Sequence, residues 1–174
     1  MMYHYTLPSE EKLLHASTKV SDPELVAFFK HQSEEERGHY RMAEHDLLEL
    51  GYAPNPQTPE PVRKYSEFWE NISEENALGY LGAVCVFENV ADNVAEDVKN
   101  YVNALNLTKK QARWLLVHIE ADEEHGREAL ETAEKFAALD NNNAMINFAE
   151  QACDVWIEIF TKAFSDIRDV GKAA

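Results

Sequence analysis

Apolar residues recur every three or four positions through four long segments of this 174-residue chain, and this periodicity restricts its fold more than any other feature. Such spacing predicts amphipathic helices, whereas the alternating pattern of strands is scarce. The helices are expected over about 22–50, over 74–104, from "LTKKQ" to about 138, and beyond "LDNNNA". The sequence therefore predicts an all-α bundle that forms a single domain over residues 1–174.

Local signals support these boundaries. Ser21 or Asp22 is expected to cap the first long helix, and Thr108 and Gln111 have the spacing of a capping box before the third. Shorter helices are predicted at "LPSEEKLLHAS" and at "RKYSEFWENI". Residues 51–62 hold four of the six prolines, so we expect a stiff surface connector there.

The composition excludes several classes of partner. A formal net charge of -16 without a basic cluster argues against nucleic acid or an anionic membrane surface as a partner. No apolar run approaches the ~20 residues that span a bilayer, and "MMYHYTLPSEEKLL" has neither the basic nor the apolar region of a signal peptide. Cys85 and Cys153 lie in apolar helical contexts and are expected to be core thiols rather than a disulfide. A cytoplasmic location is the resulting expectation.

Polar residues interrupt the core-facing side of the segment 22–50. Its apolar stripe has the 3/4 spacing of a buried helix face and consists of Leu25, Phe29, Ala43, Leu47 and Leu50. Gln32, Glu36 and His39 fall between these residues on the same face. A carboxylate and an imidazole one turn apart on a core stripe require an explanation.

Two further stripes carry the same residue types. Glu88 lies near the middle of one, among Leu81, Cys85, Asp92, Ala95 and Val102. His118, Asp122 and His125 occupy positions i, i+4 and i+7 of the other, so their side chains point the same way. The polar set on the three stripes is Glu36, His39, Glu88, His118, Asp122 and His125.

Burying these carboxylates without positive charge would cost on the order of several kcal/mol for each ion. No lysine or arginine lies on the three stripes, so bound divalent cations are the expected source of positive charge. Mixed carboxylate and imidazole ligands suit iron or manganese, and the absence of thiolates argues against a structural zinc site. We therefore predict a pair of metal ions, either two Fe ions or an Fe/Mn pair.

Each of these residues taken alone has a simpler interpretation, either as part of a solvated face or as a hydrogen-bonded core histidine. A coincidence of six such residues at the centres of three separate stripes is much less probable by chance. Glu35 competes with Glu36 as the first carboxylate, although the stripe favours Glu36. Asp92 is an alternate ligand, or a partner that orients a ligating histidine. His31 and His45 are expected at the surface.

The motifs within residues 22–138 resemble those of the haem-oxygenase-like di-iron oxidases and oxygenases, relatives of the TenA and PqqC proteins. The resemblance is carried by "EEERGH", "HDLLELGY", "LGAVCVFENVAD" and "HIEADEEH". In that family a helix with a Glu and a His precedes a lone Glu and then an H-x3-D/E-x2-3-H helix. Here 49 residues separate His39 from Glu88, 30 separate Glu88 from His118, and "HIEADEEH" completes the motif. The resemblance implies a haem-oxygenase-like fold with the six polar residues as metal ligands.

Two departures from the family pattern affect this expectation. Some members place the first glutamate seven residues before the histidine, and that position here is Gln32. The ligand must then come from the E-x2-H variant of the motif, in which Glu36 supplies it. Little sequence precedes the first ligand helix, so one peripheral helix is expected to be missing or shortened.

By resemblance, the protein would be a non-haem di-iron oxidase or oxygenase that activates O2 on a small amino-acid or fatty-acid-like substrate. Oxidative decarboxylation, C–C cleavage and N-oxygenation are the family's reactions, and nothing in the sequence chooses among them. The expected lining of the substrate pocket is Gln32, Tyr80, Cys85, Phe87 and Trp114. The apolar face of the last helix suits a homodimer interface and the inside of a monomer equally well.

Two other functions stay open from the sequence. A ferritin-like or rubrerythrin-like protein for iron storage or peroxide reduction would need Glu10 or Glu11 as a ligand and would give His118 no role. A metal-free TenA-like hydrolase or binding scaffold would need Cys85 or Cys153 as its nucleophile, and it would leave the buried acids unexplained.

Overall fold

The computed structural model describes residues 1–72 and 76–172, except for the side chains of residues 91–92, 120–123 and 164–172. Helices account for most of this part of the chain, and no strand occurs in it. The helices are α1 (Met2–Thr6), α2 (Ser9–Lys19), α3 (Pro23–Glu35), α4 (Tyr40–Glu49), α5 (Glu60–Glu70), α6 (Ala77–Ala104), α7 (Arg113–Phe136) and α8 (Ala144–Lys172), with a 3-10 turn η2 (Ala137–Leu139) after α7.

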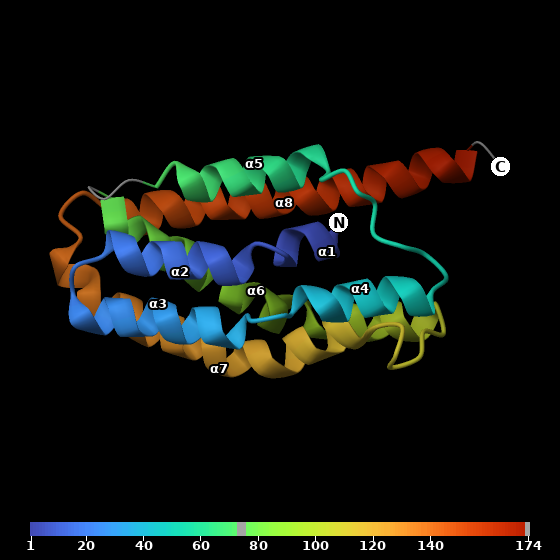
Figure 1. Ribbon diagram of the computed structural model, residues 1–174, viewed down its shortest axis with the longest axis horizontal. Helices are drawn as coiled ribbons and strands as arrows, with labels where there is room; N and C mark the ends of the chain where they lie inside the picture. Colours follow the sequence, from blue (N-terminus) through green and yellow to red (C-terminus); the bar gives the residue numbers. More distant parts are fainter. Residues whose placement is uncertain (73–75, 173–174) are drawn as a thin grey trace.

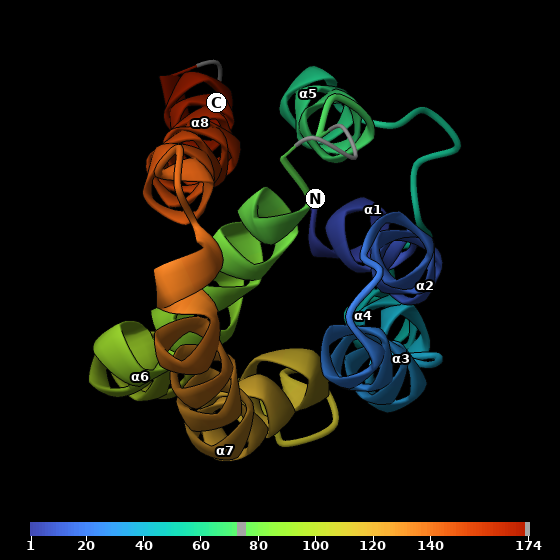
Figure 2. The same cartoon turned by 90° about the vertical axis from the view of Figure 1, so that its left-hand side faces the viewer.

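The helices form an elongated bundle around one interior (Figure 1). Helix α6 packs against both α7 and α8, while α5 covers α8, α2 packs on α3, and α1 packs on α4. An end-on view shows α6 running obliquely between α8 and α7, with α2 and α3 on the opposite side of the interior (Figure 2). The all-α prediction is confirmed.

The helix predicted over 22–50 is wrong at its middle. Asp22 caps its start as expected, because Oδ1 accepts hydrogen bonds from the backbone N–H groups of Glu24 and Leu25. The chain then leaves the helix after Glu35 and resumes at Tyr40. Gly38 lies in this interruption with φ +79°, a conformation that glycine adopts without steric cost. Helices α3 and α4 consequently follow one another along the long axis of the molecule (Figure 1).

Other boundaries differ because turns and tertiary contacts extend or shorten the predicted helices. Helix α1 lies before the first predicted helix, and α5 begins at Glu60, three residues earlier than "RKYSEFWENI". Oε1 of Gln111 accepts a hydrogen bond from the backbone N–H of Thr108, as in a capping box, but α7 itself begins only at Arg113. The predicted start of the helix at 74 lies outside the described residues.

An aromatic core joins α5, α6 and α8 on one side of the interior. Tyr80 is fully buried, stacks on Trp69 with 5.7 Å between ring centroids, and donates a hydrogen bond to the carbonyl of Ile72. Gly82 lets α8 approach α6 closely, since a Cβ there would lie 2.0 Å from the carbonyl oxygen of Met145. This core fixes the relative positions of the long helices that carry the polar stripes.

The two cysteines are both free thiols, as predicted. The prediction that both are buried is wrong for Cys153, which lies exposed on the outer face of α8, while Cys85 is half-buried. Among the described residues, no helix combines the length and the apolar character needed to cross a membrane.

Candidate metal centre

Side chains from the α3–α4 junction and from α7 converge at one point in the interior. One potential ligand atom each from Glu36, His39 and His118 lies within 4.8 Å of the other two. Nδ1 of His39 is 2.9 Å from Oε1 of Glu36, and the rings of His39 and His118 meet edge to face at 5.1 Å. Three of the predicted ligands therefore lie together, and the side chains of Glu36 and His39 are only 12% and 19% exposed.

The interruption between α3 and α4 determines how the first two residues point. Glu36 is the C-cap of α3 and His39 is the N-cap of α4, with Gly38 between them. A continuous helix would place Glu35 and Glu36 a hundred degrees apart around its axis. Glu35 and Glu36 keep this helical relation, since Glu36 still has αR backbone angles, and each therefore reaches a different histidine. The turn at Gly38 follows them and sets the direction of His39.

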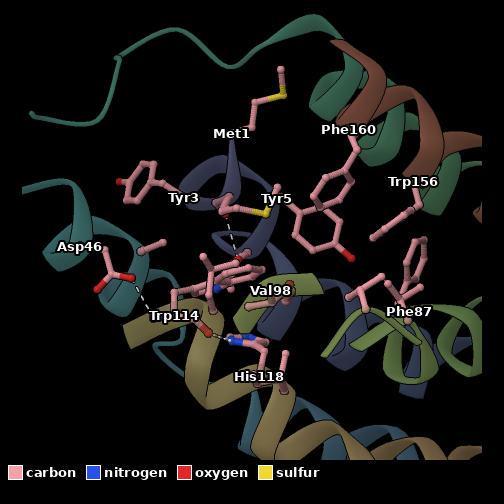
Figure 3. Close-up of a pocket in the computed structure, with 18 of the residues that line it drawn as sticks. Met1, Tyr3, Tyr5, Asp46, Phe87, Val98, Trp114, His118, Trp156 and Phe160 are labelled. Carbon is pink, nitrogen blue, oxygen red and sulfur yellow. Dashed lines mark hydrogen bonds between the residues drawn. The ribbon is translucent and has the colours of Figure 1, made fainter. Parts of the chain in front are cut away.

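A network of backbone hydrogen bonds orients His118. Its Nδ1 lies 2.7 Å from the carbonyl oxygen of Trp114, one turn earlier on α7, and its ring packs against the indole at 4.2 Å. Because Nδ1 donates to that carbonyl, Nε2 is left available as a metal ligand. Oδ2 of Asp46 accepts a hydrogen bond from the N–H of Trp114 at 2.8 Å, which ties α4 to the start of α7 (Figure 3).

A second group of acids and imidazole lies beside the first. Nε2 of His125 is 3.1 Å from Oε2 of Glu35, and Nδ1 of the same ring is 3.5 Å from Oε2 of Glu88. Glu88 and His125 are each 13% exposed. Glu35, the alternate to Glu36, thus contacts a different histidine, so each of the two adjacent acids has its own partner.

Gly126 allows α6 and α7 to approach each other at this second group. A Cβ at Gly126 would lie 2.6 Å from the side-chain oxygen of Asn89 and 3.0 Å from the carbonyl of Glu88. Nδ2 of Asn89 bridges the helices by donating to the carbonyls of Cys85 and Gly126. The small residue next to His125 therefore keeps Glu88 within reach of its ring.

Burial and charge act in opposite directions on these groups. Burial raises the pKa of Glu36, but the hydrogen bond and positive charge of His39 outweigh it, so this pKa is lowered. The hydrogen bond to Glu36 raises the pKa of His39. Burial raises the pKa of Glu88 and lowers that of His118. Burial thus disfavours the charged forms of Glu88 and His118.

The donor set fits iron. Among the described side chains, the acids of the site pair with histidines and not with lysine or arginine. Buried Nδ1 of His39 lies 2.9 Å from the Glu36 carboxylate and buried Oε2 of Glu35 lies 3.1 Å from Nε2 of His125. Ligands ~2.0–2.2 Å from an ion lie about 3 Å apart when they are at right angles, which matches the contact between His39 and Glu36. Mixed carboxylate and imidazole donors are those of iron and manganese sites.

Two predicted site residues cannot be placed. The side chains of Asp122, the sixth predicted ligand, and Asp92, an alternate, lie outside the described residues. His31 and His45, predicted at the surface, are 54% and 47% exposed.

A cavity of about 950 Å³ adjoins the acids and histidines. Glu36, Glu88 and His118 form part of its wall, and most of the remaining wall is apolar or aromatic. Figure 3 shows side chains from α1, α6, α7 and α8 grouped around it, among them Tyr5, Phe87, Trp114, Trp156 and Phe160. The cavity is large enough to hold a small organic molecule against the candidate ligands.

Of the five residues predicted to line the pocket, Phe87 and Trp114 do so. The other three belong to the packed interior instead: Tyr80 is part of the aromatic core, Gln32 is 1% exposed, and Cys85 donates a hydrogen bond to the carbonyl of Ala129. Their stripes face neighbouring helices at these positions, because helix packing and not periodicity decides which part of a core stripe borders a cavity.

The polar lining residues that were not predicted include Tyr5, Lys12 and Asp46. Helical spacing in the sequence could have indicated Lys12 and Asp46. Lys12 precedes the buried Ala16 and Val20 at helical spacing, and Asp46 lies three residues after Ala43 on the stripe already described. Tyr5 had no such signal, because α1 is short and its place beside the cavity is set by packing against α4 and α5.

Comparison with known proteins places this arrangement in context. No curated protein matches the sequence significantly. A crystal structure of a domain of unknown function with a heme oxygenase-like fold, from Shewanella denitrificans, superposes with a TM-score of 0.87. The alignment covers 99% of this chain and 78% of that one at 19% identity, which establishes a shared fold. The sequence also matches the model of the family described as "Iron-containing redox enzyme" over residues 1–157. Because this match spans most of the chain, the protein belongs to the iron-containing redox enzyme family.

Proposed function

We propose that this oxidoreductase is a di-iron oxidase or oxygenase that uses O2 to oxidise a small organic molecule held in the cavity. The observation that carries the proposal is the convergence of Glu36, His39 and His118 at the wall of a largely apolar cavity. A redox metal held there would have both a protein cage and direct access to a bound substrate.

The proposed ligands form two groups. Glu36, His39 and His118 would hold one ion, as their mutual distances support. Glu35, Glu88 and His125 would contribute to the second, with the carboxylate of Asp122 as a further ligand. One ring nitrogen of His125 would bind the ion in place of its present carboxylate contact, since the same nitrogen cannot bind an ion and a carboxylate together. Two Fe ions are proposed, and an Fe/Mn pair has the same ligand preferences.

Bound iron would supply the electrons and the open coordination positions that O2 reduction requires. The chain's own residues would set the conditions for it. The carboxylates offset the positive charge of the ions, and the carbonyl of Trp114 holds the ring of His118 in one orientation. The aromatic wall, including Phe87 and Trp156, excludes water from the space next to the ligands.

The reaction class follows only from the family's chemistry. Oxidative decarboxylation, C–C cleavage and N-oxygenation of an amino-acid or fatty-acid-like molecule are the proposed alternatives. The size and apolar lining of the cavity support an organic substrate with a substantial hydrocarbon portion.

The structure offers little support for an iron-storage or peroxide-reducing bundle. A ferritin-like site would need Glu10 or Glu11 as a ligand. Glu10 instead pairs with Arg37 at the surface, and Glu11 is exposed. His118, which would have no role there, lies among the converging side chains.

The metal-free hydrolase is also poorly supported. Burial raises the pKa of the Cys85 thiol to about 11, and its Sγ donates to a backbone carbonyl. Such a thiol is a poor nucleophile because the thiolate is the reactive form. Cys153 lies on the exposed face of α8, away from the lining of the cavity.

Iron titration of single variants tests the proposal. Chelator-treated protein would be loaded anaerobically with Fe(II), analysed for bound iron, and then exposed to O2 while visible absorption is followed. Wild type should bind two iron ions per chain, and His118→Ala should lose one of them. Glu36→Gln should weaken the same ion, whereas Glu35→Gln should weaken the other.

His45→Ala provides the matched control, since it removes an exposed histidine on α4 and should leave both ions bound. Circular dichroism would establish that each variant is folded. If His118→Ala retained all the iron, a ferritin-like site would be favoured. If wild type failed to bind Fe(II), a metal-free hydrolase or binding scaffold would be favoured.

A further inference from the structure

Lys12 of α2 directs its ammonium group into the wall of the cavity instead of into solvent. Nζ is buried and makes no hydrogen bond among the described residues. It lies 4.0 Å from the centroid of the Tyr65 ring, a cation–π contact that replaces only part of the lost hydration. A buried cation without a hydrogen-bonded anion, next to a cavity, is suited to bind an anionic ligand.

The rest of the wall restricts what that ligand can be. Lys12 is the single lysine or arginine side chain among the residues described as lining the cavity. The other ionisable side chains of the wall are mainly acids, including Asp46, Asp97 and Glu88. A polyanion such as a phosphate ester would be repelled by these acids, whereas a single carboxylate on an apolar body would meet one cation and an aromatic surface.

Tyr65 links Lys12 to the candidate metal ligands, because Nζ of Lys12 lies over its ring and all of them border the same cavity. The negative charges of Glu36 and Glu88 contribute, after burial, to raising the pKa of Tyr65, so these acids are near its hydroxyl. The carboxylate that acts on Lys12 is instead Glu70, at the end of α5. A ligand with its anionic end at Lys12 would extend along Tyr65 through this shared cavity toward the metal centre.

We propose that Lys12 binds the carboxylate of an elongated apolar monocarboxylic acid, whose opposite end lies against Glu36, Glu88 and His118. The chemistry at that opposite end rests on the proposed function, but the binding step requires no metal. Lys12 would thereby select the substrate class and set which carbon atoms reach the oxidising end of the cavity. Among the proposed reactions, this orientation would exclude oxidative decarboxylation, because the only carboxylate is held at Lys12.

The protonation of Lys12 is consistent with this role. Burial lowers its pKa to about 7, and the nearby Glu70 only partly opposes that shift. A carboxylate within hydrogen-bond distance would favour the ammonium form, so binding at pH 8 should be accompanied by proton uptake.

Ligand binding to the metal-free full-length protein tests the proposal directly. All three tryptophans, Trp69, Trp114 and Trp156, line the cavity, so intrinsic fluorescence reports its occupancy. Decanoate and the neutral decanamide serve as probes of equal length. We expect wild type to prefer decanoate and Lys12→Met to weaken decanoate binding about 10- to 100-fold, with decanamide little changed. Lys12→Arg should keep most of the decanoate affinity.

Lys109→Met is the matched control, because it removes an exposed lysine and should alter neither affinity. Calorimetry at pH 8 in two buffers of different ionisation enthalpy should show proton uptake with decanoate in wild type and not in Lys12→Met. Equal decanoate affinity in wild type and Lys12→Met would overturn the proposal and point to another cation, such as the Met1 amino group that also borders the cavity.

Absence of binding by decanoate and by the shorter hexanoate and phenylacetate would overturn it as well. These outcomes are independent of the iron titration, since the protein is free of metal throughout. If the protein bound iron but did not prefer carboxylates, the proposed function would stand and the proposed role of Lys12 would be wrong.

Discussion

At the scale of single residues, the contrast between His118 and Lys12 shows which polar groups a buried face tolerates. His118 satisfies one ring nitrogen with the carbonyl one turn earlier, a bond that any helical histidine on this stripe can form. Lys12 has no such partner, and its Nζ is buried over an aromatic ring. A lysine in that position costs stability in the ligand-free protein, so its presence indicates a role other than folding.

Lys12→Met should therefore stabilise the ligand-free, metal-free protein. Methionine has a similar volume and fills the same space without a charge. We expect the free energy of unfolding to rise by about 1–3 kcal/mol at pH 6, measured by urea denaturation.

The gain should shrink as the pH rises. The pKa of Lys12 falls from 10.5 in the unfolded chain to about 7 in the folded protein, so between these values the unfolded chain binds more protons. Wild-type stability then increases with pH across that window, and the advantage of Lys12→Met is largest below pH 7 and fades toward pH 10.5. An advantage that is independent of pH would contradict burial of an ionisable amine at this position.

At the scale of secondary-structure elements, the interruption between α3 and α4 is the feature that makes the site possible. The periodicity of 22–50 continues across it, which is why one long helix was predicted. Gly38 at φ +79° lets the chain end α3 and start α4 within a few residues. Glu35 and Glu36 at the end of α3 and His39 at the start of α4 then meet histidines of α7.

Gly38→Ala should distort this junction and weaken iron binding. Alanine at a positive φ costs roughly 1–2 kcal/mol, and relief of that strain would reposition Glu36 and His39. We expect Fe(II) affinity in an anaerobic titration to fall at least tenfold, together with the loss of stability.

Gly51→Ala separates the two effects. Gly51 has nearly the same conformation, at φ +82°, but lies at the end of α4 with nothing within 4 Å of an added Cβ. It should lose similar stability and bind iron normally. Equal iron affinities in the two variants would show that the junction does not position the ligands.

At the scale of the whole molecule, the candidate ligands join segments that are distant in the chain. Glu36 and His39 come from the α3–α4 junction, Glu88 from α6, and His118 from α7. A metal bound only by the folded protein stabilises the fold by mass action. The acids repel one another in its absence, so the effect is expected to be large for a chain of net charge -16.

Thermal unfolding should therefore respond to Mn(II), a redox-quiet substitute for Fe(II). At about 100 times the dissociation constant, the stabilisation is ~2.7 kcal/mol, or a rise in Tm of roughly 5–10 °C for a chain of this size. Ca(II), which prefers oxygen ligands without imidazole, should have little effect. A similar rise with both ions would indicate binding to the acidic surface instead of the interior site.

Periodicity alone was sufficient to predict the helical class, the approximate extent of the long helices and a polar set on three stripes, because a side chain's face depends only on its spacing along a helix. The haem-oxygenase-like fold and the iron-containing family are confirmed by the structural neighbour and the family match. The full ligand set, two ions and a dimer stay predictions.

Only the tertiary structure decided which polar residues meet and where the cavity lies. The separate partners of Glu35 and Glu36 depend on how the end of α3 packs against α7, and the chain turns after them at a single positive φ, which no hydrophobic pattern encodes. The cavity is formed by helices from both ends of the chain, so Tyr5 and Lys12 become its lining while Tyr80 becomes core. A local pattern records the inward face of each helix, but the packing of all the helices together determines what that face contacts.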